Sequence, residues 1–200
     1  MSHICADFVP NLHTRPVPID PWRVIRSDVA FSDRWYRLRR DTIALGDGTV
    51  VDDYLVSERA DIAQVVAITP EQAVVFVRQY KHGIGEITLE LPGGLLDLGE
   101  SAEAAARREL AEETGYGAAA FEPLGALVHD PPKTTNRIHG FLARRVELTH
   151  APKLDPTEDI EVVLVTVDEV ERRLRARELD VSSTVALLYR ALEALNRRPG

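Results

Sequence analysis

The stretch from Gly94 to Tyr116 reads GLLDLGESAEAAARRELAEETGY, and its second half has the composition of a helix. Between Ser101 and Thr114 the residues are mostly Ala, Glu, Arg and Leu, which are good helix formers. Ser101 can cap the first turn, and Gly115 can end the helix. One face of this predicted helix is apolar and carries Ala102, Ala106 and Leu110.

Three acidic residues of this helix do not fit an ordinary surface. Glu109, Glu112 and Glu113 are spaced i, i+3 and i+4, so they project from one face near the C-terminus, where the helix dipole disfavours negative charge. Arg108 can pair with Glu112, but one cation does not neutralise three anions. A bound Mg²⁺ or Mn²⁺ would, because both prefer clusters of oxygen ligands. The alternative is a solvated face rich in glutamate.

The complete pattern is more specific than the three acids alone. Gly94 is followed after five residues by Glu100, and after seven more by Arg-Glu-Leu-Ala-Glu-Glu-Thr-Gly, ending at Gly115. This spacing resembles the Nudix box, with Tyr116 standing where that family more often has an aliphatic residue. The resemblance implies an α+β fold, the Nudix α/β/α sandwich. It also implies an enzyme that hydrolyses a nucleoside diphosphate linked to another moiety.

The resemblance also assigns roles inside the box. It implies metal binding by three side chains and one backbone carbonyl, namely Glu109, Glu112, Glu113 and Gly93. Arg108 matches the arginine that orients these glutamates, and Glu112 would assist catalysis. Glu100 matches a further box glutamate often found near the metals.

Composition and charge restrict the remaining possibilities. The chain has 200 residues, 44% of them hydrophobic and 28% charged, which is typical of a globular protein with one well-packed domain and a modest extension. A net charge of −8 argues against nucleic-acid binding. A single cysteine excludes an internal disulfide. There is no run of 18 apolar residues and no pattern of a secretion signal, so we expect no membrane contact and a cytoplasmic location.

Residues 1–58 and 59–200 are expected to form two units. The first begins with a proline-containing arm, and strand composition then recurs at residues 22–25, 35–39 and 49–56. We expect these strands to form a small antiparallel β-sheet, which is too small to be stable alone and should mediate a homodimer. In the second unit, further strands surround the box helix, residues 137–148 form one strand, and two helices close the chain.

Four stretches outside the box resemble the ADP-ribose pyrophosphatase and nucleoside diphosphate-sugar branch of the family. They are Arg78-Gln79-Tyr80, Glu90-Leu91-Pro92-Gly93-Gly94, Pro131, and Arg137 to Ala143. This implies substrate binding by Arg78, Tyr80, Glu90 and Pro131. Arg78 could bind a diphosphate in bidentate fashion, and Tyr80 could stack on a base or ribose. The chain departs from the branch at Asp130-Pro131-Pro132-Lys133, where Ser-Pro-Gly is common, so the sugar and base stay open.

Hydrolysis of a diphosphate also requires a carboxylate that deprotonates the attacking water. In this branch the base often lies in a late acidic loop, so Glu158 is the first candidate and Glu161 the second. We expect a Mg²⁺-dependent pyrophosphatase, with Mn²⁺ as a possible substitute, that acts on ADP-ribose or a related nucleoside diphosphate sugar. The products would be a nucleoside monophosphate and a sugar phosphate. The alternatives are another nucleotide substrate, such as GDP-mannose or a dinucleoside polyphosphate, and a Nudix module that senses nucleotide sugars without turnover.

Overall fold

The computed structural model describes residues 19–154, 156 and 159–196. The N-terminal part contains β1 (Arg23–Ser32), β2 (Arg37–Ala44) and β3 (Val50–Glu58). The following strands and the box helix are β4 (Ile62–Ile68), β5 (Ala73–Lys81), β6 (Glu86–Glu90), β7 (Gly93–Leu95) and α1 (Ala102–Thr114). The chain continues with β8 (Tyr116–Gly117), β9 (Glu122–Val128), β10 (Arg137–Arg144), β11 (Glu147–Leu148), β12 (Ile160–Thr166), α2 (Val167–Ala176) and α3 (Ser182–Asn196).

A seven-stranded mixed sheet forms the centre of the molecule. Its main order is β12-β5-β4-β10-β9, with β6 paired to β5 and β7 paired to β4. The β4 and β5 strands pair directly only near their turn, at Ala67↔Val75 and Ile68↔Val74. Beyond this point they diverge, and β6 and β7 occupy the space between them. The chain that leads into the box is therefore held inside the sheet.

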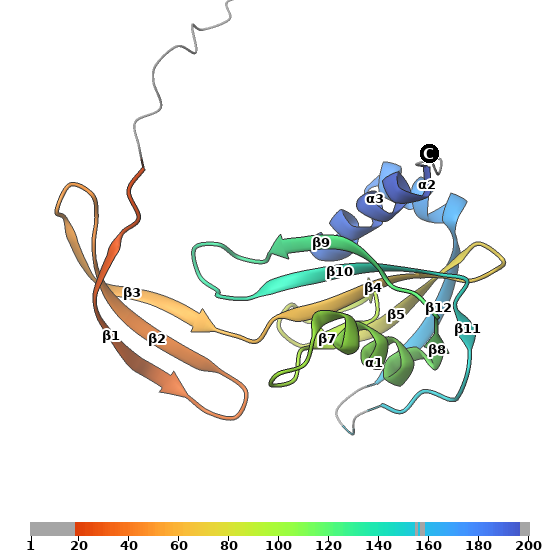
Figure 1. The fold of residues 1–200 in the computed structure, drawn as a ribbon, viewed down its shortest axis with the longest axis horizontal. Helices are drawn as coiled ribbons and strands as arrows, with labels where there is room; N and C mark the ends of the chain where they lie inside the picture. The colour runs from red at the N-terminus through yellow and green to blue at the C-terminus, as the bar shows by residue number, and fades with distance from the viewer. Residues whose placement is uncertain (1–18, 155, 157–158, 197–200) are drawn as a thin grey trace, which may run out of the picture.

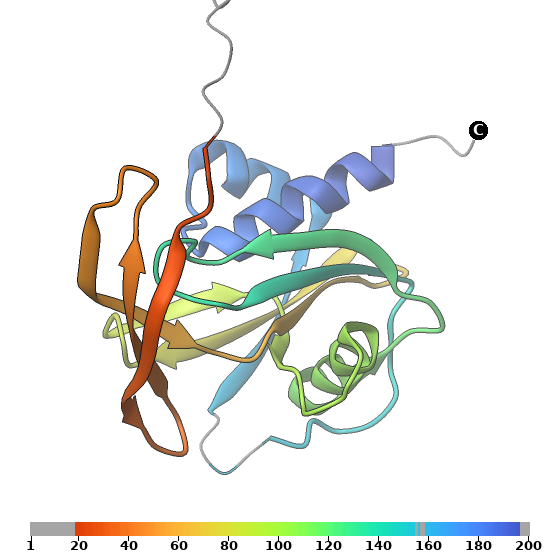
Figure 2. The ribbon, with the colours of Figure 1, turned by 60° about the vertical axis from the view of Figure 1, so that its left-hand side comes forward.

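The two faces of this sheet are covered by different helices. Figures 1 and 2 show α1 on one side and α2 with α3 on the other. The core on the α1 side is built largely from small residues, including Ala63, Ala67, Ala105 and Ala106. The core on the opposite side contains larger ones, including Phe76, Leu142, Leu187 and Leu188. This arrangement confirms the predicted α/β/α sandwich.

The N-terminal strands form a separate antiparallel sheet of order β1-β2-β3, as predicted. It lies beside the sandwich in Figure 1. Two of the predicted boundaries are wrong. The first strand extends to Ser32, and the second begins at Arg37 because the Asp33 carboxylate accepts hydrogen bonds from the backbone N–H groups of Trp35 (2.8 Å) and Tyr36 (2.7 Å), forming a turn.

The prediction of a single strand over residues 137–148 is also wrong. Arg145 has a left-handed backbone (φ 55°), which interrupts the strand after Arg144. The chain then changes partner: β10 pairs with β4 and β9, whereas β11 pairs with β8. An arginine in the sequence does not predict a left-handed backbone, because this conformation is uncommon outside glycine and asparagine.

Candidate active site

The helix α1 begins and ends where its capping residues predict. The Ser101 hydroxyl accepts a hydrogen bond from the Ala104 N–H at 3.2 Å. At the other end Gly115 is left-handed (φ 75°), and its N–H donates to the Ala111 carbonyl at 2.9 Å. These caps fix the length of the helix and hence the turn on which Glu109, Glu112 and Glu113 lie.

Two of these glutamates are buried between α1 and the glycines of β7. Glu109 and Glu113 are only 9% and 4% exposed. The Gly93 N–H donates to Glu113 Oε2 at 2.8 Å. A Cβ atom on Gly94 would overlap the carboxylate of Glu109. A side chain at residue 94 would therefore displace the Glu109 carboxylate from this position.

Arg108 organises the acidic side chains around it. Its guanidinium donates to Glu109 at 2.7 Å, to Glu112 at 3.2 Å and to the two oxygens of Glu100 at 3.0 and 2.9 Å. It also donates to the Leu95 carbonyl at 3.0 Å, which connects it to the end of β7. The hydrogen bonds from Arg108 lower the pKa of Glu100 below its ordinary value. Bonding to Glu100, and then to Glu109, raises the pKa of Arg108.

The chemistry of this cluster fits a divalent metal ion. It offers carboxylate oxygens and the backbone of β7, which are the hard ligands that Mg²⁺ and Mn²⁺ prefer. The space is kept by Gly94, as described above. Within the described ranges, no three His, Cys, Asp or Glu side chains converge into a finished metal shell. Arg108 and the Gly93 N–H hold these carboxylates in place by hydrogen bonds.

The structure divides the predicted substrate-binding residues between the two faces of the sheet. Side chains alternate along β5, where Val75 belongs to the α1-side core and Phe76 to the opposite core. Arg78 and Tyr80 therefore lie on the α2/α3 side. Glu90 lies on the α1 side, because it pairs directly with Val77.

The contacts of these side chains agree with this division. Arg78 forms an exposed ion pair with Glu161 at 2.7 Å, and these two residues are directly paired in the sheet. Tyr80 is 57% exposed. On the α1 side, Glu90 accepts a hydrogen bond from the Thr88 hydroxyl at 2.5 Å and pairs with Lys81 at 3.4 Å. The cation that β5 contributes to the α1 side is thus Lys81, to which the sequence analysis gave no role. The alternation along β5 puts Lys81 and Arg78 on opposite faces, but it does not say which face α1 covers.

Two further predictions concern loops. Glu158 lies outside the described residues. Pro131 is exposed in the turn between β9 and β10, where the Asp130 carbonyl accepts hydrogen bonds from the N–H groups of Lys133 (3.0 Å) and Thr134 (2.9 Å). This turn is attached to the N-terminal sheet, because the Tyr54 hydroxyl donates to the Pro132 carbonyl at 2.7 Å.

A pocket of about 200 Å³ joins the N-terminal sheet to the box. It is lined by residues 33–37, residues 58–60 and Leu95. Arg34 stacks over the Trp35 ring at 4.7 Å, and Trp35 is still 69% exposed. Leu95 connects this pocket to the cluster, since its carbonyl accepts the bond from Arg108. The pocket offers an aromatic surface next to the box.

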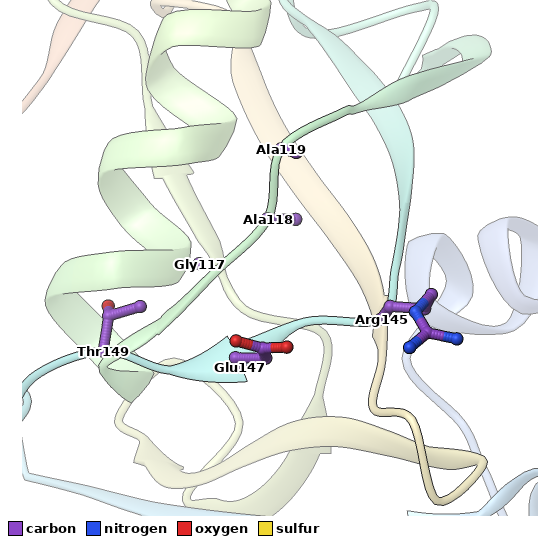
Figure 3. A pocket seen from close by; sticks show the side chains of 6 residues that line it. All are labelled: Gly117, Ala118, Ala119, Arg145, Glu147 and Thr149. Atoms are coloured by element: carbon purple, nitrogen blue, oxygen red, sulfur yellow. The ribbon is translucent and has the colours of Figure 1, made fainter.

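A larger pocket of about 450 Å³ lies elsewhere, beside β8 and β11. Figure 3 shows its lining, in which Glu147 and Thr149 follow one another along the chain and Arg145 points away from Thr149. None of its lining residues belongs to the carboxylate cluster. No helix in the described part of the chain is long and apolar enough to cross a membrane.

Comparison with known proteins agrees with this geometry. The NUDIX domain family matches residues 59–185, and the nucleoside diphosphate sugar hydrolase N-terminal domain matches residues 22–57. The chain is 30% identical to an ADP-ribose pyrophosphatase of Bacillus subtilis, over 86% of this chain and 93% of the relative. It is also 30% identical to a methanol dehydrogenase activator of Bacillus methanolicus, over 88% and 96%.

Two more similarities extend this result. The chain is 31% identical to an ADP-sugar pyrophosphatase of Mus musculus, over 72% of this chain and 74% of the relative. A crystal structure of an ADP compounds hydrolase superposes with a TM-score of 0.79 at 20% identity, covering 90% of this chain and 96% of that one, and thus shares the fold. With its box, its sandwich and its family match over residues 59–185, the chain belongs to the Nudix family of hydrolases.

Proposed function

We propose that this protein hydrolyses the diphosphate of ADP-ribose or of a related nucleoside diphosphate sugar, giving a nucleoside monophosphate and a sugar phosphate. Nudix hydrolases generally use divalent metal ions, and we propose Mg²⁺, with Mn²⁺ as a substitute. The observation that carries the proposal is the buried pair Glu109 and Glu113 against the glycines of β7. The N-terminal match to nucleoside diphosphate sugar hydrolases supports the substrate class.

The roles of the side chains follow from their positions. Glu109, Glu112, Glu113 and the Gly93 carbonyl would hold the metal, which would neutralise charge developing on the diphosphate. Arg108 keeps the glutamates in position through its bonds to Glu109 and Glu112. We place the base of the nucleotide in the 200 Å³ pocket beside Trp35, where one face of the ring can stack.

The remaining polar contacts fall on the strand end next to the box. Lys81 and Glu90 share the α1 face and form one ion pair, so Lys81 can turn toward a phosphate while Glu90 accepts from a sugar hydroxyl. Arg78 and Tyr80 lie at the same strand end on the other face, and Pro131 lies in the turn that Tyr54 fixes. For the base that activates water, Glu158 is our first candidate and Glu161 the second.

We further propose that residues 1–58 form a unit that dimerises through the N-terminal sheet. All ten residues of β1 are exposed, including the apolar Val24, Val29 and Phe31. A strand with such side chains in water is a site for association. Light scattering at micromolar concentration should give the mass of two chains. A monomeric mass would contradict this assignment.

The proposed function is tested by product analysis over a panel of nucleotides with Mg²⁺. The panel contains ADP-ribose, ADP-glucose, GDP-mannose and a dinucleoside tetraphosphate. We expect the fastest hydrolysis for ADP-ribose, with AMP and ribose 5-phosphate as products. Preference for GDP-mannose would identify a different nucleotide and sugar, and preference for the dinucleoside polyphosphate would move the chain to another substrate class. Binding without turnover would identify a sensor.

A further inference from the structure

The segment that joins the N-terminal sheet to the sandwich is not a free linker. Residues 57–61 run from the end of β3 to the start of β4, and they lie alongside residues 133–139, which run from the Pro131 turn into β10. Two backbone hydrogen bonds begin this contact. The Ser57 N–H donates to the Lys133 carbonyl at 2.7 Å, and the Thr135 N–H donates to the Ser57 carbonyl at 3.2 Å. Ser57 and Thr134 form a parallel bridge.

Side chains continue the contact where backbone pairing stops. The Thr135 hydroxyl accepts a hydrogen bond from the Arg59 N–H at 3.1 Å and lies 3.4 Å from the Arg59 carbonyl, to which it donates. Two residues further on, Asp61 Oδ1 accepts from the Arg137 N–H at 2.8 Å, and Asp61 Oδ2 is 2.7 Å from His139 Nε2. Regular parallel pairing of β4 and β10 starts at the next residues, Ile62 and Ile138.

The result is one continuous parallel contact from β3 to β10. Its middle consists of two rungs made by the side chains of Thr135 and Asp61. Ser57, whose backbone makes two of these hydrogen bonds, is only 4% exposed, and Asn136, which follows Thr135, is only 2% exposed. The Asp61 carbonyl also accepts a bond from the Leu96 N–H at 2.9 Å, so the same residue reaches the start of the box. Partial burial opposes ionisation of Asp61, but the bonds from His139 and Arg137 outweigh it and lower its pKa.

We propose that Thr135 and Asp61 are positioning residues that couple the N-terminal sheet to the loop of residues 129–136 and thereby set the affinity for the substrate. The inference rests on the proposed function, in which this loop and the N-terminal pocket flank the nucleotide sugar. The hydrogen bonds of Thr135 and Asp61 hold the end of this loop beside residues 59–61. The carboxylate cluster on α1 has its own support from Arg108 and Gly93 and does not depend on them.

Matched substitutions distinguish the effect of losing these hydrogen bonds from the effect of changing the size of the side chains. Thr135→Val keeps the shape and removes the hydroxyl, whereas Thr135→Ser keeps the hydroxyl. Asp61→Ala removes both acceptor oxygens, whereas Asp61→Asn keeps one oxygen for the Arg137 N–H. The Asp61 carbonyl bond to Leu96 is a backbone bond and persists in every variant. A separate control is Thr166→Ala, which removes the N-cap of α2 and lowers stability away from this contact.

We expect Thr135→Val and Asp61→Ala each to raise the KM for ADP-ribose about threefold to tenfold, the equivalent of one or two hydrogen bonds. The kcat should stay within about twofold, because the metal cluster is intact. Thr135→Ser and Asp61→Asn should lie near the wild type. Thr166→Ala should lower the Tm and leave the KM unchanged.

Hydrogen exchange of the amides in residues 129–137 provides a readout that is independent of turnover. Exchange should become faster in Thr135→Val and Asp61→Ala and remain unchanged in the Ser, Asn and Thr166→Ala variants. If the first two variants lower the Tm but alter neither KM nor exchange, the rungs are merely structural and the proposal is wrong. If the wild type hydrolyses no nucleotide of the panel while exchange responds as expected, the proposed function fails and the coupling of sheet and loop stands.

Discussion

The two faces of the central sheet are built from different residues and serve different purposes. On the α2/α3 side, large side chains such as Phe76, Leu187 and Leu188 are fully buried and supply most of the apolar packing. On the α1 side, alanines at Ala63, Ala105 and Ala106 bring the helix close to the strands. This close approach lowers the stabilisation from apolar burial, because alanine side chains bury fewer methylene groups than larger ones.

In return, the α1 side has room for two buried glutamates. Glu109 and Glu113 lie against Gly94 and Gly93 of β7. A Cβ on Gly94 would overlap the Glu109 carboxylate, and one on Gly93 would overlap the backbone of β4. The α2/α3 face thus stabilises the fold, whereas the α1 face holds buried carboxylates that do not serve stability. Substitutions that affect one face and spare the other test this division.

The largest expected effect concerns the two candidate bases. Glu158→Gln should lower kcat by roughly 10²–10⁴, the range of general-base catalysis, at nearly constant KM. Glu161→Gln should do much less, because Glu161 pairs with Arg78 on the α2/α3 side. Steady-state kinetics of both variants decides between them. If both remain active, the base lies in the box, with Glu100, Glu112 and Glu113 as the choices.

On the α1 side itself, Glu113→Gln should lower kcat at least about a hundredfold, as removal of an electrostatic stabiliser does elsewhere. The fold should remain intact, because one charge leaves a like-charged cluster while the amide still accepts the bond from the Gly93 N–H. Circular dichroism and turnover are measured on the same sample. Near-normal turnover in a folded variant would remove Glu113 from the metal site.

The opposite face should show the reverse pattern. Leu187 is fully buried beneath Gly140, so Leu187→Ala should cost about 2–5 kcal/mol of unfolding free energy. The kcat per folded molecule should be unchanged. Urea unfolding and active-site titration measure the two quantities. A loss of kcat in fully folded Leu187→Ala would show that the two faces are not independent.

The smallest effect distinguishes the two cations at the end of β5. Lys81→Gln should raise the KM for ADP-ribose about tenfold, the scale of one hydrogen bond to a charged group. Arg78→Gln should raise it less than about threefold, since an exposed ion pair contributes about 0–1 kcal/mol. Comparison of the two KM values is sufficient. If Arg78→Gln raises the KM more than Lys81→Gln does, Arg78 on the α2/α3 side contacts the phosphate instead of Lys81.

The sequence predicted the parts of the structure that depend on local patterns. The box helix with Ser101 and Gly115 at its ends and the three-stranded N-terminal sheet were predictable because capping and periodicity are local properties. The sandwich was implied by the resemblance of the box to the Nudix family. The break at Arg145 was not, because the left-handed backbone of an arginine and the change of partner from β4 and β9 to β8 have no local signal in the sequence.

The site residues show the same limit. The spacing of Glu109 and Glu113 identified a cluster on one helix, but the pairing of Arg78 with Glu161 depends on which strands are neighbours. To choose Lys81 over Arg78, one must know which side chains of β5 point toward α1. This follows only from the packing of β5 residues into the two cores. The contact between Asp61 and His139 joins residues 78 positions apart and has no local signal.

The claim that the α1 face is a metal centre is tested most directly by a Mn²⁺ titration followed by electron paramagnetic resonance. The wild type and the double variant Glu109→Gln, Glu113→Gln are compared in the absence of nucleotide. We predict that the wild type removes Mn²⁺ from the free signal with saturation and that the double variant does not. Equal uptake of Mn²⁺ by both proteins would contradict the assignment of this face.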